Sequence, residues 1–73
     1  MAKDIDFTLR GEHIALDALL KATGRAASGG EAKALIVAGQ VSVNGQTETR
    51  RGRKVRAGDG VHSGDHRVRV QAP

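Results

Sequence analysis

The sequence predicts an α+β fold in which two short packed helices lie against a small, strongly bent antiparallel sheet. Three observations predict it: an alternating apolar pattern near the start, two neighbouring segments with helical spacing, and a hairpin signature followed by short strands. No linker or internal repeat interrupts this order. We therefore expect a single small domain over residues 1–73.

The first predicted strand covers Asp4 to Arg10. Its apolar residues alternate with polar ones, which is the period of a strand with one buried face, at Ile5, Phe7 and Leu9. We place one strand there, ahead of both helices.

The first predicted helix runs from about Ala15 to Thr23 and stops at Gly24. Its apolar residues share one stripe at helical spacing, namely Leu16, Leu19 and Leu20. Asp17 lies four residues before Lys21, and this spacing predicts a surface ion pair. The connection that follows is so short that the two helices must pack as neighbours.

The second predicted helix has clear start and stop signals. Ser28 can cap its first amides while Glu31 reaches back to the N–H of Ser28, which is a capping box. Gly39 stands where a left-handed residue ends the helix. The apolar positions share one face and predict a short amphipathic helix; they are Ala32, Leu35 and Ile36.

A β-hairpin follows this helix directly. Val41 and Val43 alternate with polar residues, and Asn44-Gly45 supplies the two positive-φ residues of a type I′ turn. Glycine-containing turns then separate further short strands at Val55, at Val61 and from Arg67 to Val70. The predicted core lies between helices and sheet and consists of Leu19, Leu20, Leu35, Ile36, Val41, Val43, Val55 and Val61.

The positive charge is concentrated in the last third of the chain. The net charge is +4, from 12 Lys and Arg against 8 Asp and Glu. Residues 1–49 have a net charge of −1, whereas residues 50–73 have one of +5. This asymmetry indicates a polyanionic partner, with nucleic acid first and an anionic membrane surface second.

Composition also bounds the compartment. There is no cysteine, so neither a disulfide framework nor a thiolate metal site is available. The first ten residues, MAKDIDFTLR, carry charges where a signal peptide needs an apolar run, and the run from Ala34 to Ala38 is too short to span a bilayer. We expect a cytoplasmic protein with no cofactor and no membrane partner.

An ordered set of residues resembles a known family. The set covers roughly residues 14–61 and consists of Leu16-Asp17, Leu20, Gly24, Ser28, Ala32, Leu35-Ile36, Gly39, Val41, Val43-Asn44-Gly45, Val55 and Gly58-Asp59. In order and spacing it resembles the RNA-binding domain first described in ribosomal protein S-four, also called the alpha-L motif. More narrowly, Leu20-Lys21, Ser28-Gly29-Gly30, Ala32-Lys33 and the stretch ETRRGRK resemble the small stand-alone bacterial members.

The resemblance implies a domain that binds structured RNA, often ribosomal or transfer RNA, through the two helices and the adjoining basic loop. One residue departs from the family pattern. Many members have arginine after the serine that starts the second helix, where this chain has Gly29. A phosphate contact from that side chain is therefore absent here.

The start of the second helix is one candidate RNA-binding site. Gly29 and Gly30 have no side chains, so a phosphate could approach the unpaired amides after Ser28 while Lys33 supplies charge one turn along. The alternative is that the glycines only ease a crowded corner and that Lys33 is a solvated surface residue.

The cluster of Arg50, Arg51, Arg53 and Lys54 is the larger electrostatic candidate. Arginine forks grip phosphate oxygens in pairs, and Gly52 lets the backbone bend. Residues 50–56 hold five cations without an acid among them, so their mutual repulsion favours a polyanionic partner. The alternative is a solvated charge run that keeps a small protein soluble.

Other cations extend the candidate surface. Lys21 and Arg25 lie on the side of the first helix, whereas Arg67 and Arg69 alternate with valines and are expected on the outer face of the last strand. Phe7 is the only aromatic residue, which argues against base stacking on aromatic platforms. Recognition should therefore rest on backbone and shape.

Other chemistries have weaker signals. His62 and His66 flank a turn, but a turn does not hold two ligands rigidly and no third ligand is assured, so we expect no metal site. No nucleophile with a positioned base is apparent, and we expect no enzyme.

We therefore predict a non-enzymatic, monomeric RNA-binding protein that docks its second helix and arginine-rich loop on structured RNA, ribosomal or transfer RNA. The predicted RNA-binding residues are Lys21, Arg25, Ser28, Gly29, Gly30, Lys33, Arg50, Arg51, Arg53 and Lys54. The alternative is a protein-interaction adaptor whose positive loop meets an acidic patch on a ribosome or an RNA-processing enzyme.

Overall fold

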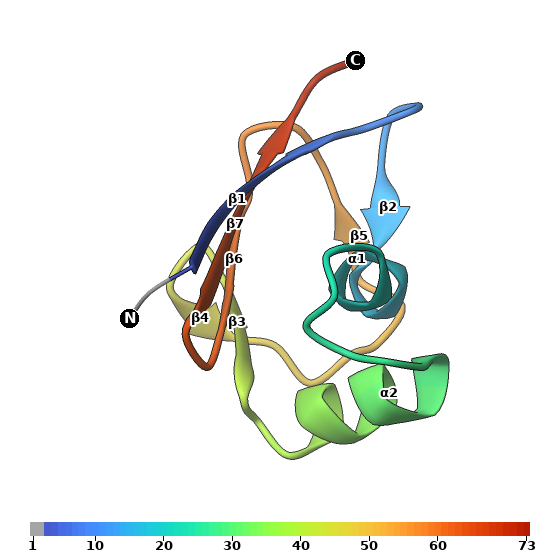
Figure 1. Ribbon diagram of the computed structural model, residues 1–73, viewed down its shortest axis with the longest axis vertical. Helices are drawn as coiled ribbons and strands as arrows, with labels where there is room; N and C mark the ends of the chain where they lie inside the picture. The colour runs from blue at the N-terminus through green and yellow to red at the C-terminus, as the bar shows by residue number, and fades with distance from the viewer. Residues whose placement is uncertain (1–2) are drawn as a thin grey trace.

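The computed structural model describes residues 3–73. Its elements are β1 (Lys3–Thr8), β2 (Ile14–Ala15), α1 (Leu16–Ala22), α2 (Gly29–Val37), β3 (Val41–Val43), β4 (Gln46–Thr47), β5 (Lys54–Val55), β6 (Gly60–Ser63) and β7 (His66–Gln71). Figure 1 shows both helices on the same side of the larger sheet. The predicted α+β class is confirmed.

The larger sheet has the strand order β1-β7-β6-β3-β4, and β2 pairs with β5 in a separate two-stranded sheet. The prediction of an antiparallel sheet needs one correction, because β1 runs parallel to β7, from Lys3 opposite His66 to Thr8 opposite Gln71. Hairpin signals specify only pairings between strands close in sequence. The partner of β1 lies at the far end of the chain, so no local signal indicated its direction.

Buried aliphatic side chains fill the space between helices and sheet. Seven of the eight predicted core residues are buried, and Leu35 is half-buried at the edge. Further buried residues complete the core, namely Leu9, Leu16, Ala26, Ala32, Val68 and Val70. Val37 points the other way and is 61% exposed, so the outward face of α2 is less polar than the predicted amphipathic pattern.

The ends of α2 follow the sequence signals closely. Ser28 Oγ accepts a hydrogen bond from the Glu31 N–H at 3.2 Å, which is one half of the predicted capping box. The return bond from the Glu31 carboxylate is not formed within residues 3–73. At the other end Gly39 has a φ of +77° and its N–H donates to Ile36 O, while the Gln40 N–H donates to Leu35 O. These two bonds satisfy carbonyls that the helix end leaves free.

One local prediction about α1 is wrong. The Asp17 carboxylate accepts from the Ala18 N–H at 2.8 Å rather than pairing with Lys21. A carboxylate near the first amides of a helix also interacts favourably with the helix dipole. Lys21 is exposed and has no acidic partner in the described part of the chain.

None of the helices within residues 3–73 is long and apolar enough to cross a bilayer.

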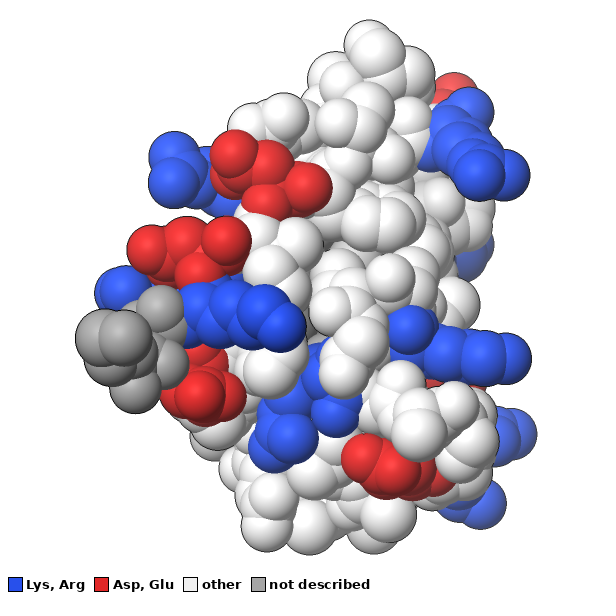
Figure 2. Space-filling model, in the orientation of Figure 1, with Lys and Arg blue, Asp and Glu red and all other residues white. Residues whose placement is uncertain are grey.

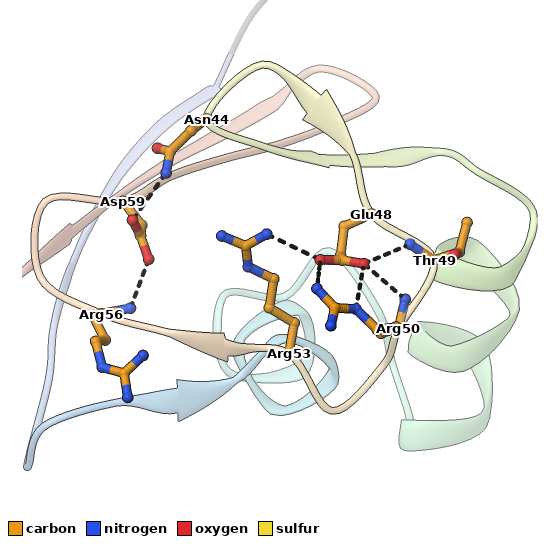
Figure 3. Close-up of polar contacts among 7 residues, drawn as sticks. All are labelled: Asn44, Glu48, Thr49, Arg50, Arg53, Arg56 and Asp59. Atoms are coloured by element: carbon orange, nitrogen blue, oxygen red, sulfur yellow. Dashed lines mark hydrogen bonds and ion pairs between the residues drawn. The ribbon is translucent and has the colours of Figure 1, made fainter.

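The hairpin turn is tied to a second turn. Asn44 and Gly45 have φ values of 53° and 84°, as the predicted turn requires. The Asn44 side chain accepts from the Gly60 N–H at 2.8 Å and donates to the Asp59 carboxylate at 2.9 Å. Partial burial alone would raise the pKa of Asp59, but hydrogen bonds from the Arg56 N–H and Asn44 lower it on balance. Figure 3 shows this connection between the β3–β4 and β5–β6 turns.

Candidate nucleic-acid interface

Residues 48–53, between β4 and β5, form a segment that we call the arginine loop. Its backbone lies against the start of α1, where the Leu16 N–H donates to Arg53 O at 2.9 Å and the Asp17 N–H donates to Arg51 O at 3.1 Å. The first amides of a helix have no partner within the helix, so the loop supplies their acceptors. In both Figure 1 and Figure 3 the loop also passes beside α2. The loop is therefore held where the two helices meet.

The arginine loop bends in a closed turn. The Arg53 N–H donates to Arg50 O at 3.2 Å, which places Arg51 and Gly52 at the tip. The Arg51 side chain is exposed and has no hydrogen-bond or ion-pair partner within residues 3–73. The sequence-predicted cluster thus has one guanidinium at its tip that is free to meet a phosphate.

A nearly buried carboxylate holds the two arginines that flank this tip. Glu48, 7% exposed, accepts from Arg50 Nε at 3.1 Å, from Arg50 Nη2 at 3.0 Å and from Arg53 Nη1 at 3.0 Å. Its side chain also accepts from the N–H groups of Thr49 and Arg50 (Figure 3). The hydrogen bonds from Arg50 and then Arg53 lower the pKa of Glu48 from 4.5 to about 2.

This arrangement corrects one step of the sequence argument. We predicted that the cations of residues 50–56 repel one another because no acid lies among them. The structure places Glu48 against Arg50 and Arg53, so an acid just before the segment offsets much of that repulsion. Charge density alone therefore does not require a partner, and the feature that favours one is the fixed, exposed tip.

The start of α2 is open to solvent. Ser28, Gly29, Gly30 and Lys33 are all exposed. A Cβ added at Gly29 would meet nothing within 4 Å, and one at Gly30 would meet only Ser28 Oγ at 3.9 Å. The glycines therefore do not ease a crowded corner, whereas Lys33 is an exposed surface residue, as the alternative expected.

Arg25, which we predicted to extend the RNA surface, also makes a contact within the protein. Its Nε donates to Ser63 Oγ at 3.0 Å, and its guanidinium lies against Gly64, whose added Cβ would stand 3.1 Å from Nη2. Arg25 thus links the α1–α2 connection to the turn between β6 and β7.

Basic and acidic side chains lie on both sides of the molecule. Figure 2 shows lysine and arginine side chains projecting on the side of the helices, with acidic side chains also visible there, and it shows blue and red next to each other on the side of β1. There Arg67 pairs with Asp4 at 3.1 Å and Arg69 pairs with Asp6 at 3.6 Å. Both arginines are exposed, as predicted for the outer face of β7, and their charges are locally balanced.

The histidines do not assemble a metal site with other side chains. His66 Nδ1 lies 3.2 Å from the Asp65 carboxylate, and His62 is exposed. Within residues 3–73 no three His, Asp or Glu side chains are grouped so as to hold a metal ion.

Two features of the site were missed from sequence. The first is β2, whose two residues are too few to show a period. The second is Glu48, which stands two residues before Arg50 and extends β4 through a bond from its N–H to Val41 O. Side chains two apart in an extended segment share a face, and that spacing was a usable signal for the contact.

Comparisons with known proteins converge on one fold. A family model described as S4 domain matches residues 7–71, which include the predicted core of the resemblance. YbcJ of Escherichia coli (strain K12), named as a candidate RNA-binding protein, is 45% identical over 60 residues, covering 82% of this chain and 86% of YbcJ. Shigella flexneri YbcJ, named as uncharacterized, matches to the same extent.

A solved structure agrees with the sequence matches. The solution structure of E. coli YbcJ, described as revealing an alfa-L motif involved in RNA-binding, superimposes with a TM-score of 0.74 at 41% identity. The match covers 99% of this chain and 92% of that one. The two-helix and sheet architecture is therefore that of the alpha-L motif.

Proposed function

The chain belongs to the S4 domain family, and from this we propose that it is a non-enzymatic RNA-binding protein. In this proposal α2 and the arginine loop form one basic surface that docks on structured RNA, ribosomal or transfer RNA. The likeness to E. coli YbcJ, whose alfa-L motif is described as involved in RNA-binding, supports the RNA partner.

One observation carries the proposal: the exposed cation at the tip of a backbone-anchored loop. Arg51 stands between two arginines that Glu48 holds, and the carbonyl of Arg51 is bonded to the start of α1. A guanidinium on a fixed backbone can meet a phosphate in two parallel hydrogen bonds. Binding then costs less conformational entropy than it would if the loop were mobile.

The start of α2 supplies the second part of the surface. The amides of Gly29 and Gly30 have no acceptor in the described part of the chain, and both residues are exposed. Such amides at a helix start attract anions, and Lys33 adds a full charge one turn along. Lys21 and Lys54 are exposed and contribute to the same positive field.

Recognition by this surface depends on phosphate positions rather than on base identity. The single aromatic residue, Phe7, is half-buried, so stacking on exposed rings is not the mode. Each neutralised phosphate releases counterions, so the affinity falls steeply with salt, with a log–log slope of about −0.7 to −0.9 per contact.

The experiment is a titration of structured ribosomal and transfer RNA with the protein at several salt concentrations. Arg51→Ala and Lys33→Ala should each weaken binding and make the slope shallower by about 0.7 to 0.9. Arg69→Ala is the matched control, because it removes the same charge from the outer face of the sheet. Equal affinity and slope for Arg51→Ala, Lys33→Ala and the unaltered protein would refute the proposed surface.

The adaptor alternative is favoured by one feature, the 61% exposure of Val37 on α2. A protein partner that covered this side chain would remain bound after nuclease treatment of a purified complex. Loss of all co-purifying macromolecules on nuclease treatment would instead support the RNA partner.

A further inference from the structure

Glu48 stands out as an acid at the centre of a surface proposed to bind a polyanion. Five hydrogen bonds reach its carboxylate, from the N–H groups of Thr49 and Arg50 and from the guanidinium groups of Arg50 and Arg53. On charge alone this residue opposes RNA binding, since it repels phosphates and offsets positive charge. Its geometry indicates the opposite effect.

The contacts of Glu48 tie together the two corners of the loop. Arg50 and Arg53 are the first and last residues of the turn that their own backbone bond closes. Arg50 Nη2 and Arg53 Nη1 both contact the same carboxylate oxygen, Glu48 Oε1, each at 3.0 Å. Between these corners only Arg51 and Gly52 remain, so fixing the corners fixes the tip.

The contacts also divide the arginines between two tasks. Glu48 occupies the Nε and Nη2 edge of Arg50, one of the two edges with which a guanidinium grips a carboxylate or phosphate through two bonds. Arg53 is half-buried, and its Nη1 donates a hydrogen bond to the same carboxylate. Arg51 keeps its entire guanidinium for a ligand.

We propose that Glu48 is a positioning residue for RNA binding: it holds Arg50 and Arg53 so that the tip of the arginine loop presents Arg51 to a phosphate. The inference rests on the proposed function and adds to it an essential acid within a basic surface. An acid that only lowered the net charge would have the opposite sign of effect, and this difference makes the proposal testable.

The test compares Glu48→Gln with Glu12→Gln in titrations of structured RNA at several salt concentrations. Both changes raise the net charge by one, and Glu12 is exposed without a partner within residues 3–73. We expect Glu12→Gln to bind as tightly as the unaltered protein or slightly tighter. Glu48→Gln should bind roughly fivefold more weakly for each arginine that RNA must then order, with no steepening of the salt slope.

Glu48→Asp is a second variant, in which the net charge is the same as in the unaltered protein. It keeps the charge but shortens the side chain by one methylene, so that the carboxylate no longer reaches both guanidinium groups. We expect weaker binding than in the unaltered protein. Circular dichroism confirms that each compared variant is folded.

Two results would overturn the inference. The first is Glu48→Gln binding as tightly as Glu12→Gln with a steeper salt slope, which would mean that Arg50 and Arg53 had been freed to meet phosphates. The second is Glu48→Asp binding as tightly as the unaltered protein. Either result leaves the proposed function intact as long as the unaltered protein binds RNA, whereas absence of binding by the unaltered protein overturns both.

Discussion

Replacing Asn44 should separate two contributions to stability that meet at one residue. Asn44 adopts a φ of 53° and its side chain bonds both Asp59 and the Gly60 N–H. Asn44→Gly keeps the backbone conformation at no steric cost but loses both side-chain bonds. At about 0.5–1.5 kcal/mol for each bond, and near the lower end because the site is exposed, the loss is about 1–2 kcal/mol.

Asn44→Ala should cost more than Asn44→Gly. Alanine loses the same bonds and must also hold a positive φ, which adds about 1 kcal/mol. For a chain of 73 residues the whole free energy of unfolding is about 4–11 kcal/mol, so either variant is measurably weakened. The expected order of stability is unaltered protein, Asn44→Gly, then Asn44→Ala.

The measurement is urea unfolding at neutral pH followed by far-ultraviolet circular dichroism, since the chain has no Trp or Tyr to report by fluorescence. A double-mutant cycle of Asn44→Gly with Asp59→Ala isolates the bond between the two turns, and we expect a coupling of about 0.5 kcal/mol or more. Zero coupling would refute the connection between the turns. Equal stability of the glycine and alanine variants would refute the backbone argument.

Three further predictions concern pH, packing and the start of α2. The pKa of Glu48 is lowered from 4.5 to about 2, so its contribution to stability is complete above about pH 4.5 and is lost as pH falls toward 2. Urea midpoints measured across this range should therefore fall less for Glu48→Gln than for the unaltered protein. An equal fall in both proteins would contradict this prediction. Ile36→Ala should lower the free energy of unfolding by about 2–5 kcal/mol because Ile36 is fully buried. Val37→Ala, on the exposed side of the same helix, should change it by less than about 0.5 kcal/mol. Similar losses for both variants in urea unfolding would show that the two faces are wrongly assigned. Gly29→Ala should leave thermal stability equal or higher, since the added Cβ meets nothing within 4 Å. The same variant should bind RNA more weakly in the salt titration. Unchanged affinity would exclude a phosphate at these amides.

The parts of this structure that sequence predicted well are those with local causes. The boundaries of α2 follow from Ser28 and Gly39, and the hairpin follows from Asn44-Gly45, because each signal acts over a few residues. The outward position of Arg67 and Arg69 follows from strand alternation in the same way.

The parts that sequence did not predict depend on contacts between distant segments. Arg25 reads as a free surface cation, but its partner Ser63 lies in β6. The arginine loop reads as exposed charge, but its carbonyls accept from the start of α1. The resemblance to the family indicated which segments to test for RNA binding, and only the structure showed that Glu48 contacts two arginines of the loop.

The parallel pairing of β1 with β7 has a consequence for the order of folding. β1 must wait until β7, which lies much later in the sequence, has been synthesised. Closing so long a stretch of chain is entropically slow compared with forming the α1–α2 pair or the hairpin. The helical half and the hairpin can therefore assemble early, and the docking of β1 completes the molecule.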